Sequence, residues 1–349
     1  MTSNHVVSEI IQIKATTLDN GINYTHMDNI LCCEECESGF LFVTLHDNFV
    51  SILYTNDFEI YNCYYIDCVR SGAKRMYSSD NYHVKICNAG PFTRICIQNK
   101  GYDFYELDSS YKLSLISDSG NDVFYDSQKL LTGYSYELTT HGYRCFAEDN
   151  LQIPLDYRGH ENPKLLVINS EKCLVYNMKH LLILIDHDKP ECHHEFENIN
   201  GTNFTSAIYS KELDKIFLLS TDDGVLIVTD SNLEHQEAIR VVQDVKWSDI
   251  IIFKGYIFMC GGSMIAYSKE SELSNWTFKS FEFQVSKFKL TDEGMLCFGI
   301  NGHCVSFDRE LNHKVLSSFP VRLKSLKNWF MSKNKCIGIT DSEIFTCDC

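Results

Sequence analysis

The alternation of apolar and polar segments is clearest between Lys215 and Ser231, where the sequence reads "KIFLLSTDDGVLIVTDS". An apolar run meets a short polar turn that ends in Asp-Gly, and a second apolar run follows. β-Branched and aromatic residues favour strands, and Gly224 can adopt the positive φ angle that a tight chain reversal requires. The segment therefore predicts a β-hairpin with Gly224 in its turn.

The same apolar–polar–apolar pattern recurs along most of the chain. When the residue at the Gly224 position is taken as a marker, successive copies lie 53, 41, 38, 44, 38, 40 and 40 residues apart. The markers are Asn48, Gly101, Gly142, His180, Gly224, Gly262, Gly302 and Ser342. Further short apolar segments lie between the hairpins, so each period holds about four short strands. This recurrence is typical of a repeat architecture.

A second regularity supports this register. Six residues after the marker, an acidic residue stands in five of the eight copies. These acids are Glu148, Asp186, Asp230, Asp308 and Asp348. Helical periodicity is absent over any long window, and with 5 prolines and 18 glycines the turns rely heavily on Asn, Asp and Ser. The sequence therefore predicts an all-β chain.

Four antiparallel strands in each period describe one blade of a β-propeller. We expect a single propeller domain over residues 1–349, with seven or eight four-stranded blades. The expected blades cover residues 28–66, 82–116, 122–155, 163–196, 204–241, 245–281, 283–319 and 321–349. A two-domain β-sandwich would also contain short strands at regular spacing, but it does not explain a recurrence every 38–44 residues.

On these residues the chain resembles the WD40 repeat family. The segment "LLSTDDGVLIVTDS" is similar to the strand–turn–strand core of that family, and Phe307-Asp308 stands where its Trp-Asp dipeptide would lie. No copy contains the Trp-Asp pair or the family's Gly-His dipeptide at its usual place, so packing alone must hold most blades together. The resemblance implies a propeller fold and a role in binding other proteins.

The two ends of the chain predict how the ring closes. The unit after Val321 offers three strands and then stops, whereas Val6–Lys14, "VVSEIIQIK", reads as a lone strand before a polar loop. A terminal strand that completes an unfinished blade protects an otherwise exposed edge. We therefore expect a closing strand over residues 6–14, with Val7–Ile13 as the outer strand of the C-terminal blade.

Composition and charge narrow the possible functions. Apolar residues make up 44% of the chain and aromatic residues 13%, which allows a substantial core, while the net charge of −16 argues against general binding to nucleic acids or anionic membranes. The N-terminus lacks the features of a secretory signal, and no apolar run is long enough for a membrane span. The 16 cysteines are scattered, many within apolar runs, so we interpret them as reduced thiols and expect a cytoplasmic or nuclear location.

Candidate metal sites and catalytic motifs are weak. Cys33-x-x-Cys36, together with Cys347 and Cys349 near the end of the chain, could supply thiolate ligands, and "CHHEF" at Cys192–Phe196 gathers a thiol, two imidazoles and a carboxylate in an expected loop. Free thiols and ordinary surface residues explain both segments more simply. No nucleophile elbow, zincin motif or phosphate-binding loop is present. We therefore expect no metal, no cofactor and no catalytic residue.

One basic feature contrasts with the acidic chain. The segment from Val321 to Lys335, "VRLKSLKNWFMSKNK", contains no acid, and a second basic cluster follows the first hairpin. In a closed ring these connections could share one rim, suited to an acidic protein segment or to an RNA backbone. The candidate basic rim comprises Arg70, Lys74, Arg75, Arg322, Lys324, Lys327 and Trp329. Solubilising side chains on separate strands are the simpler explanation.

Three functions are compatible with these observations. The favoured one is a non-enzymatic scaffold or adaptor subunit of an intracellular multiprotein complex, which binds one or more proteins through a propeller face. The second is an accessory subunit of an RNA-binding or tRNA-modifying complex, which requires the basic rim. The third is a propeller enzyme with its active site in the central channel. Fold alone does not choose among them.

Overall fold

The computed structural model describes most of the predicted strands and, between Phe204 and Leu316, most of the connections as well. The described residues are 11–14, 16–17, 23–26, 29–36, 39–45, 49–67, 83–89, 92–98, 102–107, 113–119, 124–129, 135–139, 142–146, 151–153, 163–169, 171–178, 181–186, 194–197, 204–220, 224–242, 245–291, 294–299, 303–316, 328–332, 335–340 and 342–348.

These residues form eight antiparallel sheets, which we call blades 1 to 8. Blade 1 contains β4 (Ile30–Cys36), β5 (Gly39–Leu45), β6 (Phe49–Thr55) and β7 (Ile60–Asp67), with β1 (Ile11–Lys14) added outside. Blade 2 contains β8 (His83–Ala89), β9 (Phe92–Gln98), β10 (Tyr102–Leu107) and β11 (Leu113–Ser119). Blade 3 contains β12 (Phe124–Lys129), β13 (Ser135–Thr139), β14 (Gly142–Phe146) and β15 (Leu151–Ile153). Blade 4 contains β16 (Lys164–Val167), β17 (Lys172–Met178), β18 (Leu181–Asp186) and β19 (His194–Glu197).

The C-terminal half follows the same plan. Blade 5 contains β20 (Phe204–Ser210), β21 (Lys215–Ser220), β22 (Val225–Asp230) and β23 (Gln236–Arg240). Blade 6 contains β24 (Asp249–Phe253), β25 (Tyr256–Gly261), β26 (Met264–Lys269) and β27 (Thr277–Ser280). Blade 7 contains β28 (Val285–Leu290), β29 (Met295–Gly299), β30 (Cys304–Phe307) and β31 (His313–Leu316). Blade 8 contains β32 (Asn328–Ser332), β33 (Lys335–Ile339) and β34 (Glu343–Asp348), joined by β2 (Thr16–Thr17) and β3 (Asn23–His26).

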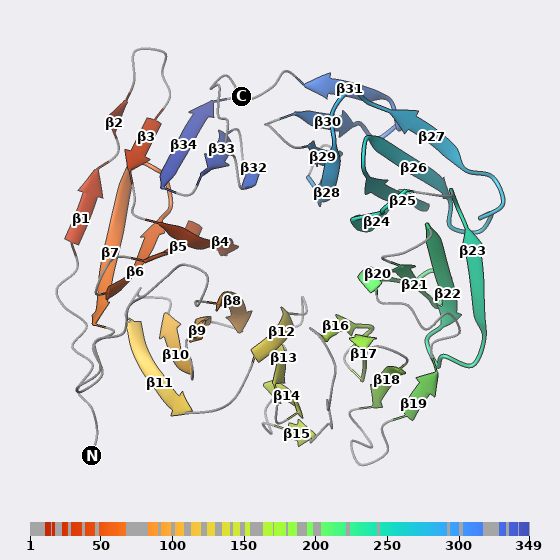
Figure 1. Ribbon diagram of the computed structural model, residues 1–349, viewed down its shortest axis with the longest axis horizontal. Helices are drawn as coiled ribbons and strands as arrows, with labels where there is room; N and C mark the ends of the chain where they lie inside the picture. Colours follow the sequence, from red (N-terminus) through yellow and green to blue (C-terminus); the bar gives the residue numbers. More distant parts are fainter. Residues whose placement is uncertain are drawn as a thin grey trace.

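The blades stand radially around a common centre (Figure 1). The first strand of each blade is innermost, and the inner strands of neighbouring blades contact one another from β4 through to β28. The described residues contain no helix, and hence none that could span a membrane. This arrangement confirms the predicted all-β propeller.

The hairpin predicted around Gly224 is formed by β21 and β22. Its ladder runs from the pair Lys215–Asp230 to the pair Leu219–Leu226. Gly224 has a φ of 62°, and a β-carbon there would overlap the carbonyl oxygen of Val242. Glycine is therefore required both by the backbone angle and by the close approach of the next connection.

The recurring acid has a structural role in the turn before the outer strand. In blade 5, Asp230 accepts hydrogen bonds from the backbone N–H groups of Asn232 at 2.9 Å and Glu234 at 3.1 Å. In blade 7, Asp308 accepts one from the N–H of Asn312 at 2.8 Å. A carboxylate at this position stabilises the turn by satisfying N–H groups that no strand pairs with.

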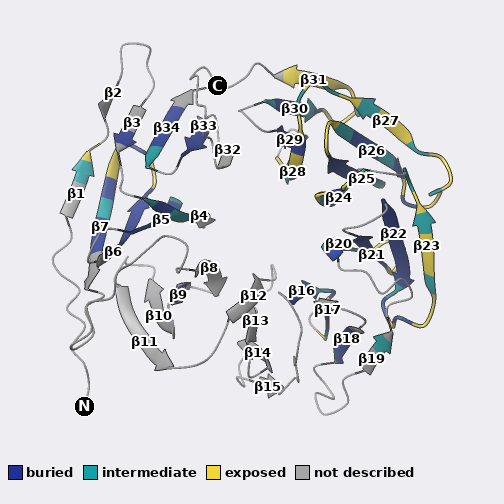
Figure 2. Ribbon diagram, in the orientation of Figure 1, coloured by how far each residue is buried: buried dark blue, intermediate teal, exposed yellow. Residues whose placement is uncertain are grey.

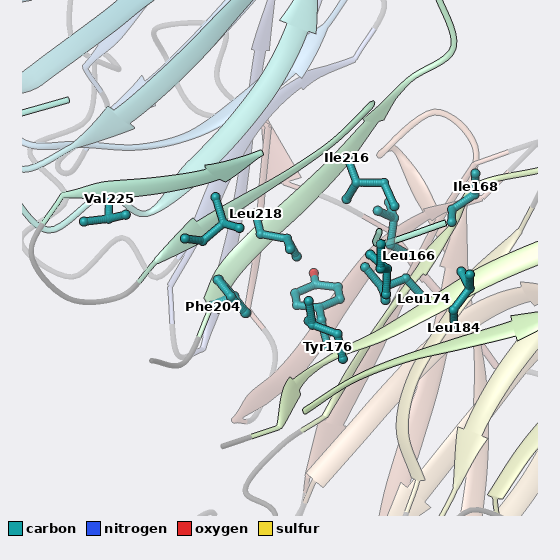
Figure 3. Close-up of a cluster of buried hydrophobic side chains, with 12 residues drawn as sticks. Leu166, Ile168, Leu174, Tyr176, Leu184, Phe204, Ile216, Leu218 and Val225 are labelled. Atoms are coloured by element: carbon teal, nitrogen blue, oxygen red, sulfur yellow. The ribbon is translucent and has the colours of Figure 1, made fainter. Parts of the chain in front are cut away.

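The core lies between the blades, because side chains of each sheet alternate between its two neighbours. The close-up in Figure 3 shows the cluster between blades 4 and 5, where side chains from the two sheets face each other. The labelled residues are Leu166, Ile168, Leu174, Tyr176, Leu184, Phe204, Ile216, Leu218 and Val225. Middle strands such as β21 are buried on both faces and so read as continuous apolar runs, whereas the outer strands β23, β27 and β31 are largely exposed (Figure 2).

The closing strand was assigned to the wrong residues. Residues 6–10 lie outside the described ranges, and Ile11–Lys14 pairs as β1 with β7 of blade 1, not with the C-terminal blade. The strand that does pair in blade 8 is β3, which lies against β34 from Asn23–Thr346 to His26–Glu343. The isoleucines of Val7–Ile13 make that segment look more like a strand than the polar β3 does. In the structure, however, Ile13 packs on the blade 1 core, and β3 lies inside the blade 8 sheet between β2 and β34.

Candidate functional site

The predicted basic rim falls almost entirely outside the described residues. Arg70, Lys74, Arg75, Arg322, Lys324 and Lys327 all lie there, and Trp329 is placed only by its backbone, in the inner strand β32 of blade 8. The basic rim therefore stays a prediction.

The candidate metal segments are only partly described. Cys33 and Cys36 lie in β4 and Cys347 lies in β34, while Cys349 and Cys192 lie outside the described ranges. The part of "CHHEF" that is described, His194–Phe196, belongs to strand β19, so the expected loop was wrong there. Among the described residues no group of three or more His, Cys, Asp or Glu side chains is arranged to hold a metal ion.

A row of polar contacts links the inner strands of blades 4 to 7. The Lys164 ammonium donates to the backbone carbonyl of Thr205, and the Thr205 hydroxyl donates to the carbonyl oxygen of Trp247 at 3.3 Å. The row continues from Ser206 through Asp249 to the backbone of Phe288. We call these residues the inner belt: Lys164, Thr205, Ser206, Asp249 and Phe288.

Asp249 is the centre of the inner belt. The Ser206 hydroxyl donates to its Oδ1 at 3.2 Å, and the Phe288 N–H donates to its Oδ2 at 2.9 Å. Burial raises the pKa of Asp249 above its ordinary value, although the hydrogen bonds from Phe288, Ile250 and Ser206 oppose this rise. The carboxylate therefore joins blades 5, 6 and 7 and has both oxygens engaged in structural contacts.

The connection between blades 6 and 7, residues 281–284, is fixed at both ends. The N–H of Phe281 donates to the carbonyl oxygen of Ser263 at 2.8 Å, and the N–H of Val285 donates to that of Gly262 at 2.7 Å. Both acceptors lie in the turn between β25 and β26, where Gly262 has a φ of 54°. This connection, which we call the crossing segment, is thereby held against its own blade.

The crossing segment presents an aromatic cluster, the aromatic rim, formed by Phe281, Phe283 and His303. The Phe283 ring stacks on the His303 ring, with the ring centroids 4.4 Å apart and the planes at 14°. The ring centroids of Phe281 and Phe283 are 5.5 Å apart. All three side chains are half-buried. A β-carbon at Gly299 would come within 2.8 Å of the Phe283 ring, so this glycine leaves the space that Phe283 occupies.

Sequence reasoning missed the aromatic rim. Phe281 and Phe283 lie at the boundary between the expected blades 245–281 and 283–319, to which the sequence prediction assigns no role. Two phenylalanines in a surface connection are unusual, because such segments are mostly polar. That local excess of aromatic residues was the signal available in the sequence.

Comparison with known proteins identifies the fold and nothing narrower. No protein-family model and no curated protein matches the chain. Among solved structures, the C-terminal WD40 domain of Sif2 matches with a TM-score of 0.67 and 7% identity, over 92% of this chain and 96% of that one. Sqt1 of Saccharomyces cerevisiae matches with a TM-score of 0.64 and 10% identity, over 93% of this chain and 98% of that one.

An enzyme is also among the structural neighbours. Virginiamycin B lyase from Staphylococcus aureus matches with a TM-score of 0.51 and 10% identity, over 83% of this chain and 96% of that one. At such identities the likeness concerns the fold and leaves the function open. The chain therefore has the fold of a divergent WD40-like β-propeller.

Proposed function

We propose that the protein is a non-enzymatic interaction scaffold that binds one or more protein partners within an intracellular complex. The observation that supports this proposal is the aromatic rim, a half-buried cluster in which Phe281 and Phe283 of the crossing segment, which is fixed at both ends, lie beside His303 of blade 7. Aromatic side chains dominate the binding energy of protein interfaces when they sit in well-packed surroundings. A cluster that is already ordered also loses little conformational entropy on binding.

The inner belt is consistent with a scaffold. Asp249 accepts one hydrogen bond from Ser206 of blade 5 and one from Phe288 of blade 7, so its carboxylate joins the blades. The groups that join the inner strands of blades 4 to 7 therefore serve to hold the blades in place. Rigid blades keep a docking surface in one geometry.

The rim also defines what a partner must present. Its half-exposed faces are the rings of two phenylalanines and one imidazole, so a partner needs an apolar or aromatic anchor rather than a densely charged segment. Polar contacts would come from Glu282 and Gln284, which are exposed next to the phenylalanines in the sequence, and from Ser263, which is exposed and whose carbonyl oxygen accepts from the Phe281 N–H. An apolar centre with a polar margin is the common arrangement of protein interfaces.

Paired surface variants test this function. Partner proteins are captured from a lysate of cells that naturally express the protein. Three versions serve as bait: the wild type, the rim variant Phe281→Ser/Phe283→Ser and the control Phe278→Ser. Phe278 is 41% exposed on β27, so the control removes a surface phenylalanine of the same blade outside the rim. We expect the rim variant to lose specific partners about tenfold or more in quantitative mass spectrometry, and the control to retain them. Phe281 and Phe283 also pack against the core between blades 6 and 7, so capture is measured well below the melting temperature of every variant. Equal capture by all three folded proteins would refute the proposal.

A further inference from the structure

The outer edge of blade 1 carries a strand that the blade does not need. Strands β4 to β7 already make four, and β1 adds a fifth by pairing with β7 from Ile11–Cys63 to Lys14–Ile60. Strand β3 has a different role, because it lies within the sheet of blade 8 and extends its three C-terminal strands. In Figure 1, β1 lies along the outside of blade 1, and the chain then continues to β2 and β3 at blade 8.

Strand β1 is held less firmly than β3. Thr25 of β3 is only 4% exposed, whereas Ile13 of β1 is half-buried and Lys14 is exposed. Within the described residues the β1 ladder has four residue pairs, and a single residue, Ala15, separates β1 from β2 in the sequence. A strand on the edge of a sheet is among the first elements to open locally.

The pairing of β1 with β7 is also imperfect. Lys14 lies opposite Ile60, and residues directly opposite each other in an antiparallel pair have their side chains on the same face. Ile60 remains 41% exposed beside this lysine. A segment with an apolar residue at the Lys14 position would cover Ile60 better than β1 does.

We propose that the outer edge of β7 is a strand-addition site that β1 occupies in cis, and that an extended segment of a partner protein replaces β1 there. The partner segment carries branched apolar residues at alternate positions, matching Ile11 and Ile13, and a third apolar residue opposite Ile60. Backbone hydrogen bonds to β7 supply affinity, and the alternate side chains supply selectivity. This site is separate from the aromatic rim and goes beyond the scaffold function proposed above.

A labelled peptide tests the site in the full-length chain. The peptide has the sequence of residues 8–16 with Lys14→Ile, and its binding is followed by fluorescence anisotropy. The protein variant carries Gln12→Pro and Ile13→Pro. Along an antiparallel ladder, residues that donate a backbone N–H to the neighbouring strand alternate with residues that do not. One of two adjacent prolines must therefore remove an N–H that β1 donates to β7. We expect this variant to bind the peptide about tenfold more tightly than the wild type. The matched control Gln12→Ala/Ile13→Val, which keeps the backbone donors, binds like the wild type.

A second pair of proteins keeps the test decisive if the proline variant fails to fold. In full-length Lys14→Ile, β1 covers Ile60 and pairs more stably with β7, so this variant should bind the peptide several-fold more weakly than the wild type. In the wild type, hydrogen exchange at residues 11–14 should rise as peptide is added, because the peptide displaces β1. Equal binding by all variants, or none, overturns the proposal. If the wild-type protein self-associates and the proline variant does not, the outer edge of blade 1 binds a second copy of this chain. That result would overturn the proposal of a different partner protein. The rim variant Phe281→Ser/Phe283→Ser binds the peptide normally, so this result is independent of the rim.

Discussion

The junction between blades 6 and 7 and the junction between blades 8 and 1 are built differently. Blades 6 and 7 pack through an aromatic and thiol-containing core around Phe258, Cys297 and Phe307, and Asp249 joins their inner strands. Blades 8 and 1 pack through an aromatic and aliphatic core that includes Phe42 and Ile344. The first junction joins blades that follow each other in the chain, whereas the second joins the two ends of the described chain.

Of these two junctions, only the one between blades 8 and 1 depends on strand pairing to hold the two parts of the chain together. The crossing segment links blades 6 and 7 covalently, so a loss of packing there leaves the two blades attached. At the other junction, β3 must stay paired with β34 to keep the C-terminal strands beside blade 1. Damage at the junction of blades 8 and 1 should therefore spread to both ends of the chain.

Two equivalent truncations give the largest expected effect. Phe42→Ala and Phe258→Ala each remove a fully buried ring, so each should lower the free energy of unfolding by about 3–5 kcal/mol in urea titrations. Hydrogen exchange distinguishes them. Phe42→Ala should raise exchange in both β3 and β34, whereas Phe258→Ala should leave those strands protected. The same exchange pattern for both variants would contradict the proposed asymmetry.

The two N-terminal strands should differ in their contribution to stability. Thr25→Pro places a proline inside the blade 8 sheet, where it leaves buried backbone groups without partners, so the free energy of unfolding should fall by about 2–3 kcal/mol. Gln12→Pro/Ile13→Pro removes a hydrogen bond at the outer edge of blade 1 and part of the packing of Ile13 on the blade 1 core, and should cost about 1–2 kcal/mol. Thermal and chemical denaturation of the two variants measure both. A larger loss from the β1 variant would show that β1, not β3, secures the end of the ring.

The two junctions should respond to opposite ends of the pH scale. Burial raises the pKa of Asp249 above its ordinary 3.8 and that of Tyr61, near Thr25 of β3, above its ordinary 10.0. For each group the neutral form is favoured in the folded state, so its contribution is fully present below the unfolded pKa and is lost as pH rises through the folded pKa. The free energy of unfolding of Asp249→Asn should therefore increase relative to that of the wild type as pH rises above about 4. For Tyr61→Phe, the same relative increase should begin only above about pH 10.

Urea denaturation across the pH range checks both profiles, each variant serving as the control for the other. If Asp249→Asn showed a constant offset from the wild type between pH 3 and pH 7, Asp249 would have the same pKa in the folded and unfolded states. The buried environment assigned to the inner belt would then be wrong.

A substitution at Gly299 should change stability only modestly and tests the aromatic rim. A β-carbon there would crowd the backbone carbonyl oxygen of Gln284 at 2.7 Å and the Phe283 ring at 2.8 Å, so Gly299→Ala should cost about 1–2 kcal/mol and displace the crossing segment together with Phe283. Partner capture should fall although the fold persists, as near-ultraviolet circular dichroism can confirm. Gly255→Ala is the matched control for a glycine substitution, because no atom lies within 4 Å of a β-carbon there, although its φ of 72° adds backbone strain. Partner capture that survives Gly299→Ala while Phe283 is displaced would argue against the rim.

Local features of this fold could be predicted from the sequence, and non-local ones could not. The hairpin around Gly224 and the turn acids Asp230 and Asp308 depend on residues close in the chain, so their spacing carried the information. The partner of the N-terminal strand depends on an edge far away in sequence. Both β7 and β34 offered such an edge, and apolar content alone pointed to the wrong pairing.

The candidate site was predicted less well, for a related physical reason. The basic rim was inferred from charge along the chain, while the aromatic rim arises from stacking between Phe283 and His303, which belong to different connections. Likewise, Asp249 begins an apolar strand, and nothing near it in sequence indicates that Ser206 and Phe288 will complete its hydrogen bonds. Such contacts appear only once the blades are set side by side.

Cross-linking of the protein within its native assembly, followed by mass spectrometry, shows whether a partner protein occupies the aromatic rim. A partner seated on the aromatic rim lies near Lys279 and Lys287, which flank the crossing segment on β27 and β28. We expect partner cross-links to be concentrated on these two lysines and to be lost with Phe281→Ser/Phe283→Ser. Cross-links confined to lysines of other blades, such as Lys172 or Lys215, and unaffected by that variant would contradict this proposal.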